Sequence, residues 1–190
     1  MKTILLDCDD VLLDWISGFR KFAASKLAYD IEGEPGSWDM SSWLGISKDL
    51  TGWLINEFNS SPDFGRLGPV GGAKRVIQQM HDDPDVRLHV ISSCSSASNV
   101  AALRRANLIE EFGDVFDSIH CLDLGQSKLP ILRAFQPGAM FIEDSYKNAL
   151  MGLEAGHMSC IRERPHNRKF KQLTDLRLHW FADWSEMGKI

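Results

Sequence analysis

The chain opens with a short apolar segment that leads directly into acidic residues, and this arrangement limits the folds open to it. Residues 4–6 (Ile-Leu-Leu) form the continuous apolar run of a strand buried in a parallel sheet, and Asp7 and Asp9 follow at once. Carboxylates at the carboxyl end of such a strand face the crevice where open α/β sheets bind ligands. Like charges are costly to gather there unless a cation or a catalytic role compensates, although an acidic surface turn is the alternative.

Two later apolar runs also end in polar residues. Residues 87–91 lead into Ser92-Ser93, and residues 139–142 lead into Glu143-Asp144. Between these two runs, Lys128 stands at the predicted start of a helix. The chain therefore contains, in this order, an acid pair, a hydroxyl pair, a lysine and a second acid pair, and the acids and hydroxyls follow predicted strands.

Strand and helix patterns alternate through the C-terminal two-thirds of the chain. Such alternation predicts an α/β fold in which a Rossmann-like parallel sheet carries helices on both faces. The expected strands after the first one are residues 87–91, 115–122, 139–142, 158–161 and 179–181. The expected helices of this part are residues 70–80 and 148–155.

Residues 15–67 interrupt the alternation with two helical patterns. The first has apolar residues at helical spacing over residues 16–27. The second begins after Ser47 as N-cap and has one apolar face, made of Leu50, Trp53, Leu54 and Phe58. Two helices inserted after the first strand predict a small helical cap over the active site, and an ordinary pair of surface helices is the alternative. We therefore expect a core domain of residues 1–14 and 68–190 and a helical cap domain of residues 15–67.

The order of the four motifs resembles that of the haloacid dehalogenase superfamily of aspartate-nucleophile phosphatases. The resemblance implies that Asp7 is the catalytic nucleophile and forms an aspartyl-phosphate. Asp9 would be the catalytic general acid for the leaving group and then the general base for water. Lys128 and a hydroxyl of Ser92 or Ser93 would bind the phosphate.

The same resemblance implies a Mg²⁺ site made of oxygen ligands. Its ligands would be Asp7, the main-chain carbonyl of Asp9 and the carboxylate of Asp144, while Glu143 would bind the metal directly or through water. Many members of the superfamily have glycine where this chain has Asp10, which leaves the geometry of the loop open. Dehalogenases of the superfamily lack the second aspartate, so the presence of Asp9 favours phosphoryl transfer.

Several segments are similar to the narrower family of 5′(3′)-deoxyribonucleotidases. They are residues 7–15, residues 62–64 and 67–73 at the predicted exit from the cap, and residues 164–167 (Arg-Pro-His-Asn) in a late loop. In that family, aromatic side chains of the first motif and of the cap hold the nucleobase. The resemblance implies that Trp15, Phe64 and Phe19 bind substrate, with core packing of the cap as the alternative for each.

The function expected from these motifs is Mg²⁺-dependent hydrolysis of phosphomonoesters by a 5′-nucleotidase or deoxyribonucleotidase that releases phosphate from nucleoside monophosphates. A sugar-phosphate or phosphoglycolate-type phosphatase, or a mutase, of the same superfamily is the alternative, since Glu143-Asp144-Ser145 followed by Ala155-Gly156 fits those enzymes too. A non-catalytic phosphate-binding regulator is a third hypothesis, although a pure binder would gain nothing from the charge repulsion of these acids.

Composition limits the partners and the compartment. The 190 residues carry a net charge of −5, which argues against binding of nucleic-acid polymers. No apolar run is long enough to cross a bilayer and the N-terminus lacks the features of a signal peptide, so no membrane partner is expected. Four scattered cysteines without a CxxC pair suit a reducing cytoplasm.

The expected partner is a small phosphomonoester such as a nucleotide. A homodimer stays open, because Trp180 and Trp184 are expected to be exposed and could form an interface or cover the sheet edge.

Overall fold

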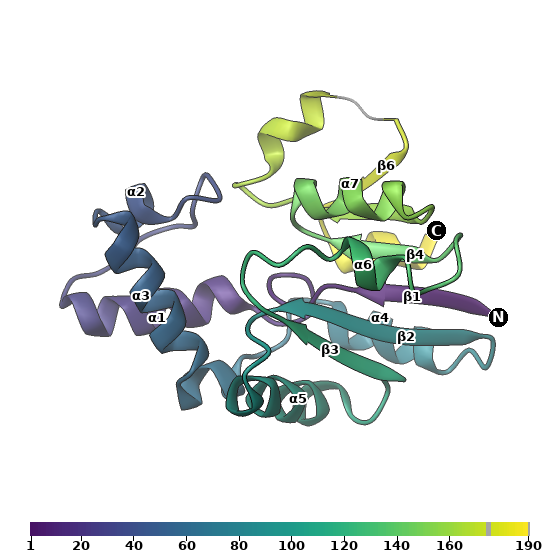
Figure 1. Ribbon diagram of the computed structural model, residues 1–190, viewed down its shortest axis with the longest axis horizontal. Helices are drawn as coiled ribbons and strands as arrows, with labels where there is room; N and C mark the ends of the chain where they lie inside the picture. Colours follow the sequence, from purple (N-terminus) through teal and green to yellow (C-terminus); the bar gives the residue numbers. More distant parts are fainter. Residues whose placement is uncertain (174–175, 190) are drawn as a thin grey trace.

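The computed structural model describes residues 1–173 and 176–189. Within them, six strands form one parallel sheet in the order β3-β2-β1-β4-β5-β6 (Figure 1). The strands are β1 (Lys2–Leu6), β2 (Val86–Ser93), β3 (Ser118–Leu122), β4 (Met140–Glu143), β5 (Met158–Arg162) and β6 (Leu178–Phe181). The predicted α/β parallel sheet is therefore confirmed, and β1 lies at its centre between β2 and β4.

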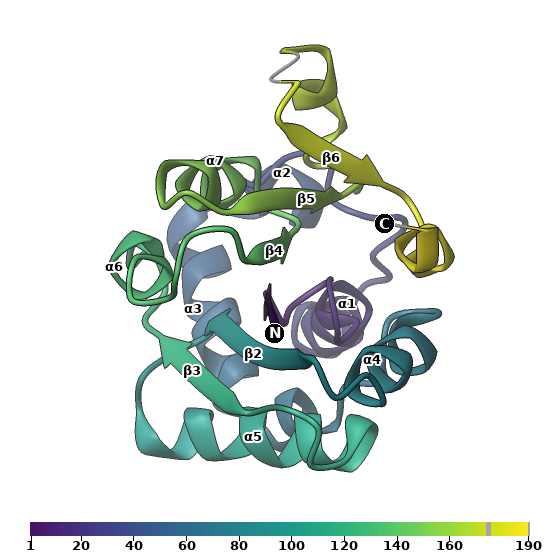
Figure 2. The same cartoon turned by 90° about the vertical axis from the view of Figure 1, so that its right-hand side faces the viewer.

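Helices cover both faces of the sheet, as expected. They are α4 (Ala73–His81) and α5 (Ser98–Phe112) on one face, and α6 (Leu129–Leu132) and α7 (Tyr146–Glu154) on the other (Figure 2). Strand β1 serves both faces because successive side chains of a strand point to opposite sides. Leu6 belongs to the apolar cluster that contains residues of α4 and α5, whereas Leu5 packs in the cluster that contains Leu132 of α6.

Strand β3 begins at Ser118 and not at Val115 as predicted. The Asp117 N–H donates to the Leu88 carbonyl at 2.8 Å, and the Asp117 carboxylate accepts the Leu88 N–H at 2.9 Å. The Asp117 carboxylate thus accepts the Leu88 N–H, which a backbone carbonyl would accept if β3 began earlier in the chain. For this reason the pairing of β3 with β2 starts at Ser118. Val115 is buried before the strand begins.

Three helices of the segment after β1 lie beyond the carboxyl ends of the strands, at the end of the molecule opposite the N-terminus (Figure 1). They are α1 (Trp15–Leu27), α2 (Ser41–Leu44) and α3 (Lys48–Asn59), followed by the 3₁₀ segment η1 (Pro62–Arg66). The predicted N-cap of α3 is confirmed, because the Ser47 hydroxyl accepts the Leu50 N–H at 3.2 Å. The domain boundary at residues 15–67 stays a prediction.

The predicted apolar face of α3 is wrong in part. Leu54 and Phe58 are buried, but Leu50 is 39% exposed and Trp53 is 50% exposed. The helix packs through a narrow stripe that also includes Thr51, and the two other apolar side chains lie outside this stripe. Spacing alone therefore overestimated the width of the packed face.

The expectation of an exposed Trp184 is also wrong. Trp184 belongs to the 3₁₀ segment η3 (Trp184–Lys189), is fully buried, and donates its Nε1–H to the Val11 carbonyl at 2.8 Å. Trp180 is half-buried and packs against the cluster around Ile161. The C-terminal segment thus braces the loop that follows β1. No helix of the described residues is long and apolar enough to cross a membrane.

Candidate active site

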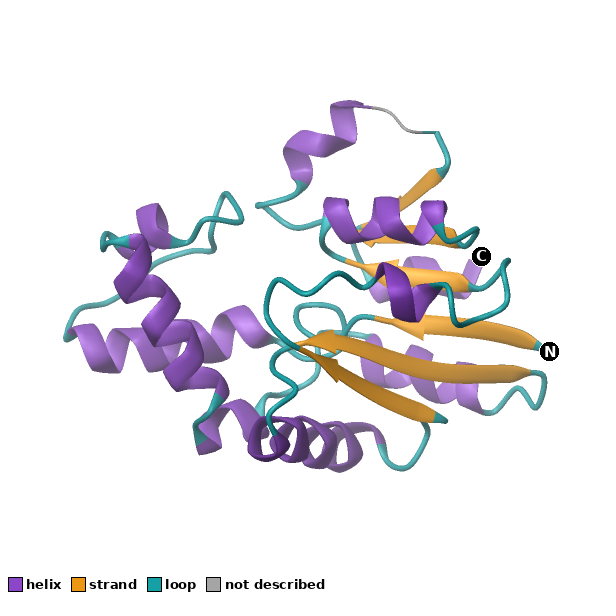
Figure 3. Cartoon of the chain, viewed as in Figure 1, coloured by secondary structure: helices purple, strands orange, loops and turns teal. Residues whose placement is uncertain are grey.

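The three central strands bring the predicted acids and hydroxyls to one edge of the sheet. Asp7 directly follows β1, Ser93 is the last residue of β2, and Glu143 is the last residue of β4. The Asp7 N–H donates to the Ile142 carbonyl at 2.8 Å, which fixes the start of the loop against β4. The connecting loops at this edge face α1 and α3 (Figure 3).

Three of the predicted metal ligands form a compact, buried cluster. One carboxylate oxygen each from Asp7, Glu143 and Asp144 lies within 4.8 Å of the others. These are hard oxygen donors of the kind that Mg²⁺ prefers. Among the described residues, Lys128 forms ion pairs with Asp7 and Glu143 and His166 lies beside Asp144, so a divalent cation would balance the negative charge that remains in the cluster. The residues present therefore fit Mg²⁺.

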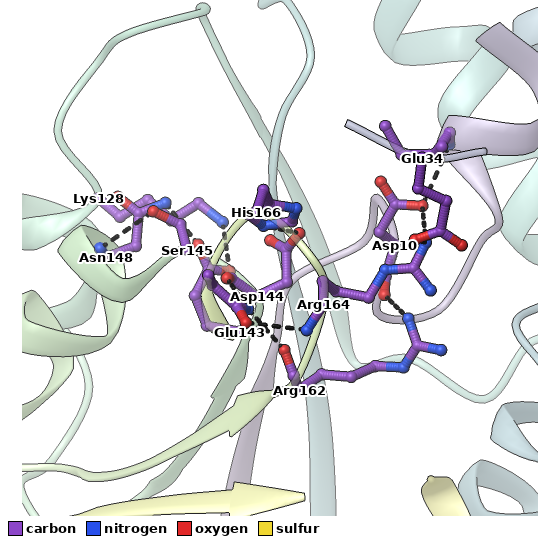
Figure 4. Close-up of polar contacts among 12 residues, drawn as sticks. Asp10, Glu34, Lys128, Glu143, Asp144, Ser145, Asn148, Arg162, Arg164 and His166 are labelled. Atoms are coloured by element: carbon purple, nitrogen blue, oxygen red, sulfur yellow. Dashed lines mark hydrogen bonds and ion pairs between the residues drawn. The ribbon is translucent and has the colours of Figure 1, made fainter. Parts of the chain in front are cut away.

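Lys128, to which the resemblance assigns phosphate binding, is buried beside the acid cluster. Its Nζ lies 2.6 Å from Asp7 Oδ1 and 3.2 Å from Glu143 Oε2, and Asn148 donates to the other oxygen of Glu143 (Figure 4). Burial favours loss of the lysine proton, but the charges of Asp7 and Glu143 outweigh burial and raise the Lys128 pKa above its usual value. Burial, reinforced by the Asp7 charge, also raises the pKa of Glu143.

Asp9 has a partner that the sequence analysis missed. Arg104 of α5 is fully buried, and its Nη2 lies 2.5 Å from Asp9 Oδ1. Burial raises the pKa of Asp9 to about 7 although the positive charge of Arg104 opposes this shift. A carboxyl group with such a pKa is suited to give and take a proton near neutral pH. The signal in the sequence was an arginine at helical spacing between the buried Val100 and Leu108.

Asp10 occupies a left-handed backbone conformation, with φ of 58°. Asp adopts this region more readily than most residues because its short side chain can form local hydrogen bonds. Asp10 Oδ1 accepts the Ile16 N–H at 3.1 Å, and the Asp10 carbonyl accepts a hydrogen bond from Arg162. An acid is therefore compatible with the turn where many superfamily members have glycine.

The late loop after β5 closes one side of the site. His166 Nε2 lies 3.2 Å from Asp144 Oδ2, and Asn167 donates to the Asp144 carbonyl at 2.7 Å. Arg164 Nη2 lies 3.8 Å from Asp10 Oδ1 and 3.0 Å from Glu34 Oε2 in the loop between α1 and α2 (Figure 4). These contacts connect the second acid pair, the first loop and the segment that carries α1–α3.

A cavity of about 390 Å³ opens above these residues. The acids and Lys128 line its floor, together with Ser93. The apolar part of its lining comes from two parts of the chain: Trp15, Ile16, Trp38, Met40 and Ile55 belong to the segment after β1, whereas Leu124 and Met151 belong to the loop after β3 and to α7. Trp15 is oriented by a 3.0 Å hydrogen bond from its Nε1 to Asn59 Oδ1. Trp38 is 63% exposed and meets His166 edge-on.

Three residues predicted to contact substrate do not line this cavity. Ser92 is fully buried below it, and Ser93 lines it instead. Phe19 is buried and stacks on Trp15 with ring centroids 4.6 Å apart. Phe64 is buried with its ring 3.9 Å from the Arg104 guanidinium. In these places all three side chains contribute to packing, and direct contact with substrate would require them to move.

The sequence matches no protein-family model and no curated protein. Solved structures with a similar fold do exist. A haloacid dehalogenase-like family hydrolase from Streptococcus pneumoniae is 13% identical with a TM-score of 0.66, covering 100% of this chain and 97% of that chain.

Two further structures carry informative ligands. CbbY from Rhodobacter sphaeroides, in complex with xylulose-(1,5)bisphosphate, is 18% identical with a TM-score of 0.63, covering 99% of this chain and 96% of that chain. The D,D-heptose 1.7-bisphosphate phosphatase from B. bronchiseptica, complexed with magnesium and phosphate, is 14% identical with a TM-score of 0.59, covering 100% of this chain and 97% of that chain. At these identities the likeness concerns the fold, and it shows that the chain folds as haloacid dehalogenase-like hydrolases do.

Proposed function

We propose that this chain is a Mg²⁺-dependent phosphomonoester hydrolase that works through an aspartyl-phosphate on Asp7. The observation that carries the proposal is the position of Asp7 at the cavity floor, within the acidic cluster and 2.6 Å from Lys128 Nζ. The lysine places a positive charge beside the Asp7 carboxylate, the group that would act as nucleophile. The resemblance of the four motifs and the likeness of the fold to haloacid dehalogenase-like hydrolases support the same activity.

The residues would act in two steps. In the first, an Asp7 carboxylate oxygen attacks phosphorus while the bond to the leaving oxygen breaks, and Asp9 gives that oxygen its proton. In the second, Asp9 takes a proton from water, which attacks the aspartyl-phosphate, frees Asp7 and releases phosphate. Lys128 and the hydroxyl of Ser93, or of Ser92 after a shift, would hold the phosphoryl oxygens.

Mg²⁺ would be held by Asp7, Asp144 and the Asp9 carbonyl, with Glu143 bound directly or through water, and it would neutralise charge on the phosphoryl group. Asn167 and His166 would keep Asp144 in place through the contacts described above. Residues 15–67 would act as the cap that excludes water from the cavity.

For the substrate class we propose nucleoside monophosphates. The lining of the cavity contains two indole rings, Trp15 and Trp38, in addition to the acids. Stacking of a nucleobase on such rings contributes roughly 1–3 kcal/mol per base. A nucleobase offers these rings a larger flat aromatic face than a sugar does, and this favours a nucleotide.

A sugar-phosphate or phosphoglycolate-type phosphatase is the second candidate. It is favoured by two proteins of similar fold, one complexed with a sugar bisphosphate and the other named a heptose bisphosphate phosphatase. Against a bisphosphate substrate, the cavity lining contains, among the described residues, two lysines, Lys128 and Lys147, and no arginine that could hold a second phosphate. A homodimer stays a prediction. All four cysteines are free, which agrees with the proposed cytoplasmic location.

A substrate panel tests the proposal. Phosphate release should be measured with Mg²⁺ on deoxynucleoside, ribonucleoside and hexose monophosphates and on phosphoglycolate. We expect the highest kcat/KM for a nucleoside monophosphate, and a loss of this preference in Trp15→Ala. Higher activity on the sugar phosphates or phosphoglycolate would support the second candidate, and phosphate binding without release from any ester would indicate a regulator.

A further inference from the structure

Arg104 is an unusual residue for a helix interior. Its side chain is completely buried, it comes from α5 and not from any of the four motifs, and it does not line the cavity. Of its guanidinium nitrogens, Nη2 contacts Asp9, whereas Nε and Nη1 have no hydrogen-bond partner among the described residues. Buried donors without partners destabilise a fold, so stability alone does not explain the Arg104–Asp9 ion pair. We therefore consider a role of Arg104 in the function of Asp9.

The guanidinium is held by two contacts. Asp9 accepts a hydrogen bond from Nη2 at 2.5 Å, and the centre of the Phe64 ring lies 3.9 Å from the guanidinium carbon. The Asp9 side chain is 22% exposed and lines the cavity, so the open face of this carboxyl group remains accessible to a substrate. A planar cation that is stacked on a ring and paired with a carboxylate can adopt few orientations.

The α5 helix is itself clamped to the chain that leaves the predicted cap. Asn107, one turn after Arg104, accepts the Leu67 N–H at 3.0 Å and donates to the Leu67 carbonyl at 2.8 Å. Gly65 also approaches α5 closely, since a Cβ there would lie 2.9 Å from a Leu103 methyl group. Phe64 is therefore kept at a set distance from the Arg104 side chain.

We propose that Arg104 is a positioning residue that fixes the Asp9 carboxyl group for proton transfer, with Phe64 as its support. The inference rests on the proposed phosphatase function. Without the Arg104 contact, Asp9 would be free to rotate in its loop or to turn toward solvent. Transfer of the proton to the leaving oxygen would then be slower, while binding of the phosphate by Lys128 and attack by Asp7 would be unaffected.

The loss of activity expected without the Arg104 contact depends on the leaving group of the substrate. This dependence distinguishes a loss of Asp9 positioning from a general loss of structure. An alkoxide leaving group needs the proton of Asp9 in the first step, whereas p-nitrophenolate is stable without a proton. The ratio kcat/KM reports steps up to formation of the aspartyl-phosphate, so it excludes the later reaction with water. A loss of Asp9 orientation should thus affect kcat/KM for alkyl phosphates and largely spare p-nitrophenyl phosphate.

The test compares four variants on the best alkyl phosphate and on p-nitrophenyl phosphate with Mg²⁺. We expect Arg104→Met to lower kcat/KM for the alkyl phosphate about 100-fold, the low end of general acid–base contributions, and for p-nitrophenyl phosphate less than about threefold. Arg104→Lys should retain part of the activity, and Phe64→Leu should show the same selective loss with a smaller size. Arg105→Met is the matched control, because Arg105 is exposed on the same helix and should leave both substrates unaffected.

Thermal melting of each variant measures the fold. Equal losses on both substrates, or unchanged kinetics in Arg104→Met, would overturn the inference. If Arg104→Met does not fold, Arg104→Lys and Phe64→Leu decide by the same comparison. A wild-type protein that hydrolyses neither substrate would instead refute the proposed function, so the two failures can be distinguished.

Discussion

At the scale of single residues, the charged side chains of the site repel or stabilise one another and have to be considered as a group. Asp7, Glu143 and Asp144 lie close enough to repel one another, and Lys128 is in direct contact with two of them. Substitutions here act on chemistry and on stability at the same time. Variants that preserve shape are therefore the informative ones.

Asp7→Asn tests the nucleophile. The amide keeps the size of the side chain but removes the attacking anion, so kcat should fall by several orders of magnitude. Lys128 keeps Glu143 as a partner, so the fold should persist. Steady-state kinetics with circular dichroism as the fold control measures both effects. Turnover comparable to that of the wild type would mean that another residue attacks phosphorus.

Asp10 provides a stability prediction. Asp10→Ala loses the hydrogen bond to the Ile16 N–H and keeps a left-handed conformation that costs a residue with Cβ about 1–2 kcal/mol. Asp10→Gly loses the same hydrogen bond but relieves the backbone strain. In urea unfolding we expect wild type to be most stable, then Gly, then Ala. An Ala variant as stable as the Gly variant would refute this account of the turn.

At the scale of elements, the position of α7 sets the position of the second acid pair. The helix begins directly after Asp144 and Ser145, and it lies on β4 and β5 with its Gly152 against them. The side chain of Ser159 on β5 donates to the Ala149 carbonyl at 2.8 Å. The second acid pair thus precedes a helix, α7, that packs closely on β4 and β5.

Gly152→Ala should disturb this packing. A Cβ there would lie 2.3 Å from Ser159 Oγ and 2.6 Å from a ring carbon of Phe141. Overpacking of this kind costs roughly 1–3 kcal/mol, which outweighs the gain of about 1 kcal/mol in helix propensity. The matched control is Gly52→Ala in α3, where a Cβ meets nothing within 4 Å and should raise stability. Denaturant unfolding of both variants checks the opposite signs.

At the scale of the whole molecule, metal binding and folding should be linked. The acid cluster joins segments from β1 and β4, so it exists only in the folded chain. A ligand that binds only the folded state stabilises it by about 2.7 kcal/mol at 100 times its Kd. The central sheet and the site should therefore gain stability together when Mg²⁺ binds.

We expect Mg²⁺ to raise the melting temperature and EDTA to abolish both this rise and the activity. Asp144→Asn should remove most of the Mg²⁺-dependent rise. Asp82→Asn, an exposed carboxylate at the end of α4, should leave the rise intact and serves as the control. A melting temperature indifferent to Mg²⁺, with full activity in EDTA, would disprove the metal site.

The sequence by itself determined the sheet and the acids at its edge. Apolar runs and the polar residues that end them are local patterns, and their period follows from backbone geometry alone. Asp7, Glu143, Asp144 and a serine of the pair at 92 and 93 could thus be predicted to meet, because the ends of parallel strands lie at one edge, whereas the prediction for Lys128 at its helix start came from the resemblance of the motifs. The same local reasoning could not decide between Ser92 and Ser93, which differ only in the face they occupy.

The tertiary structure decided which large side chains reach the cavity and which support it. Phe64 and Trp15 both fit an aromatic substrate wall in the sequence, but Phe64 lies under Arg104 and Trp15 lines the cavity. Arg104 meets Asp9 across 95 positions of the chain. No local pattern encodes such a contact, because it arises only when α5, η1 and the loop after β1 pack together and bury the charge.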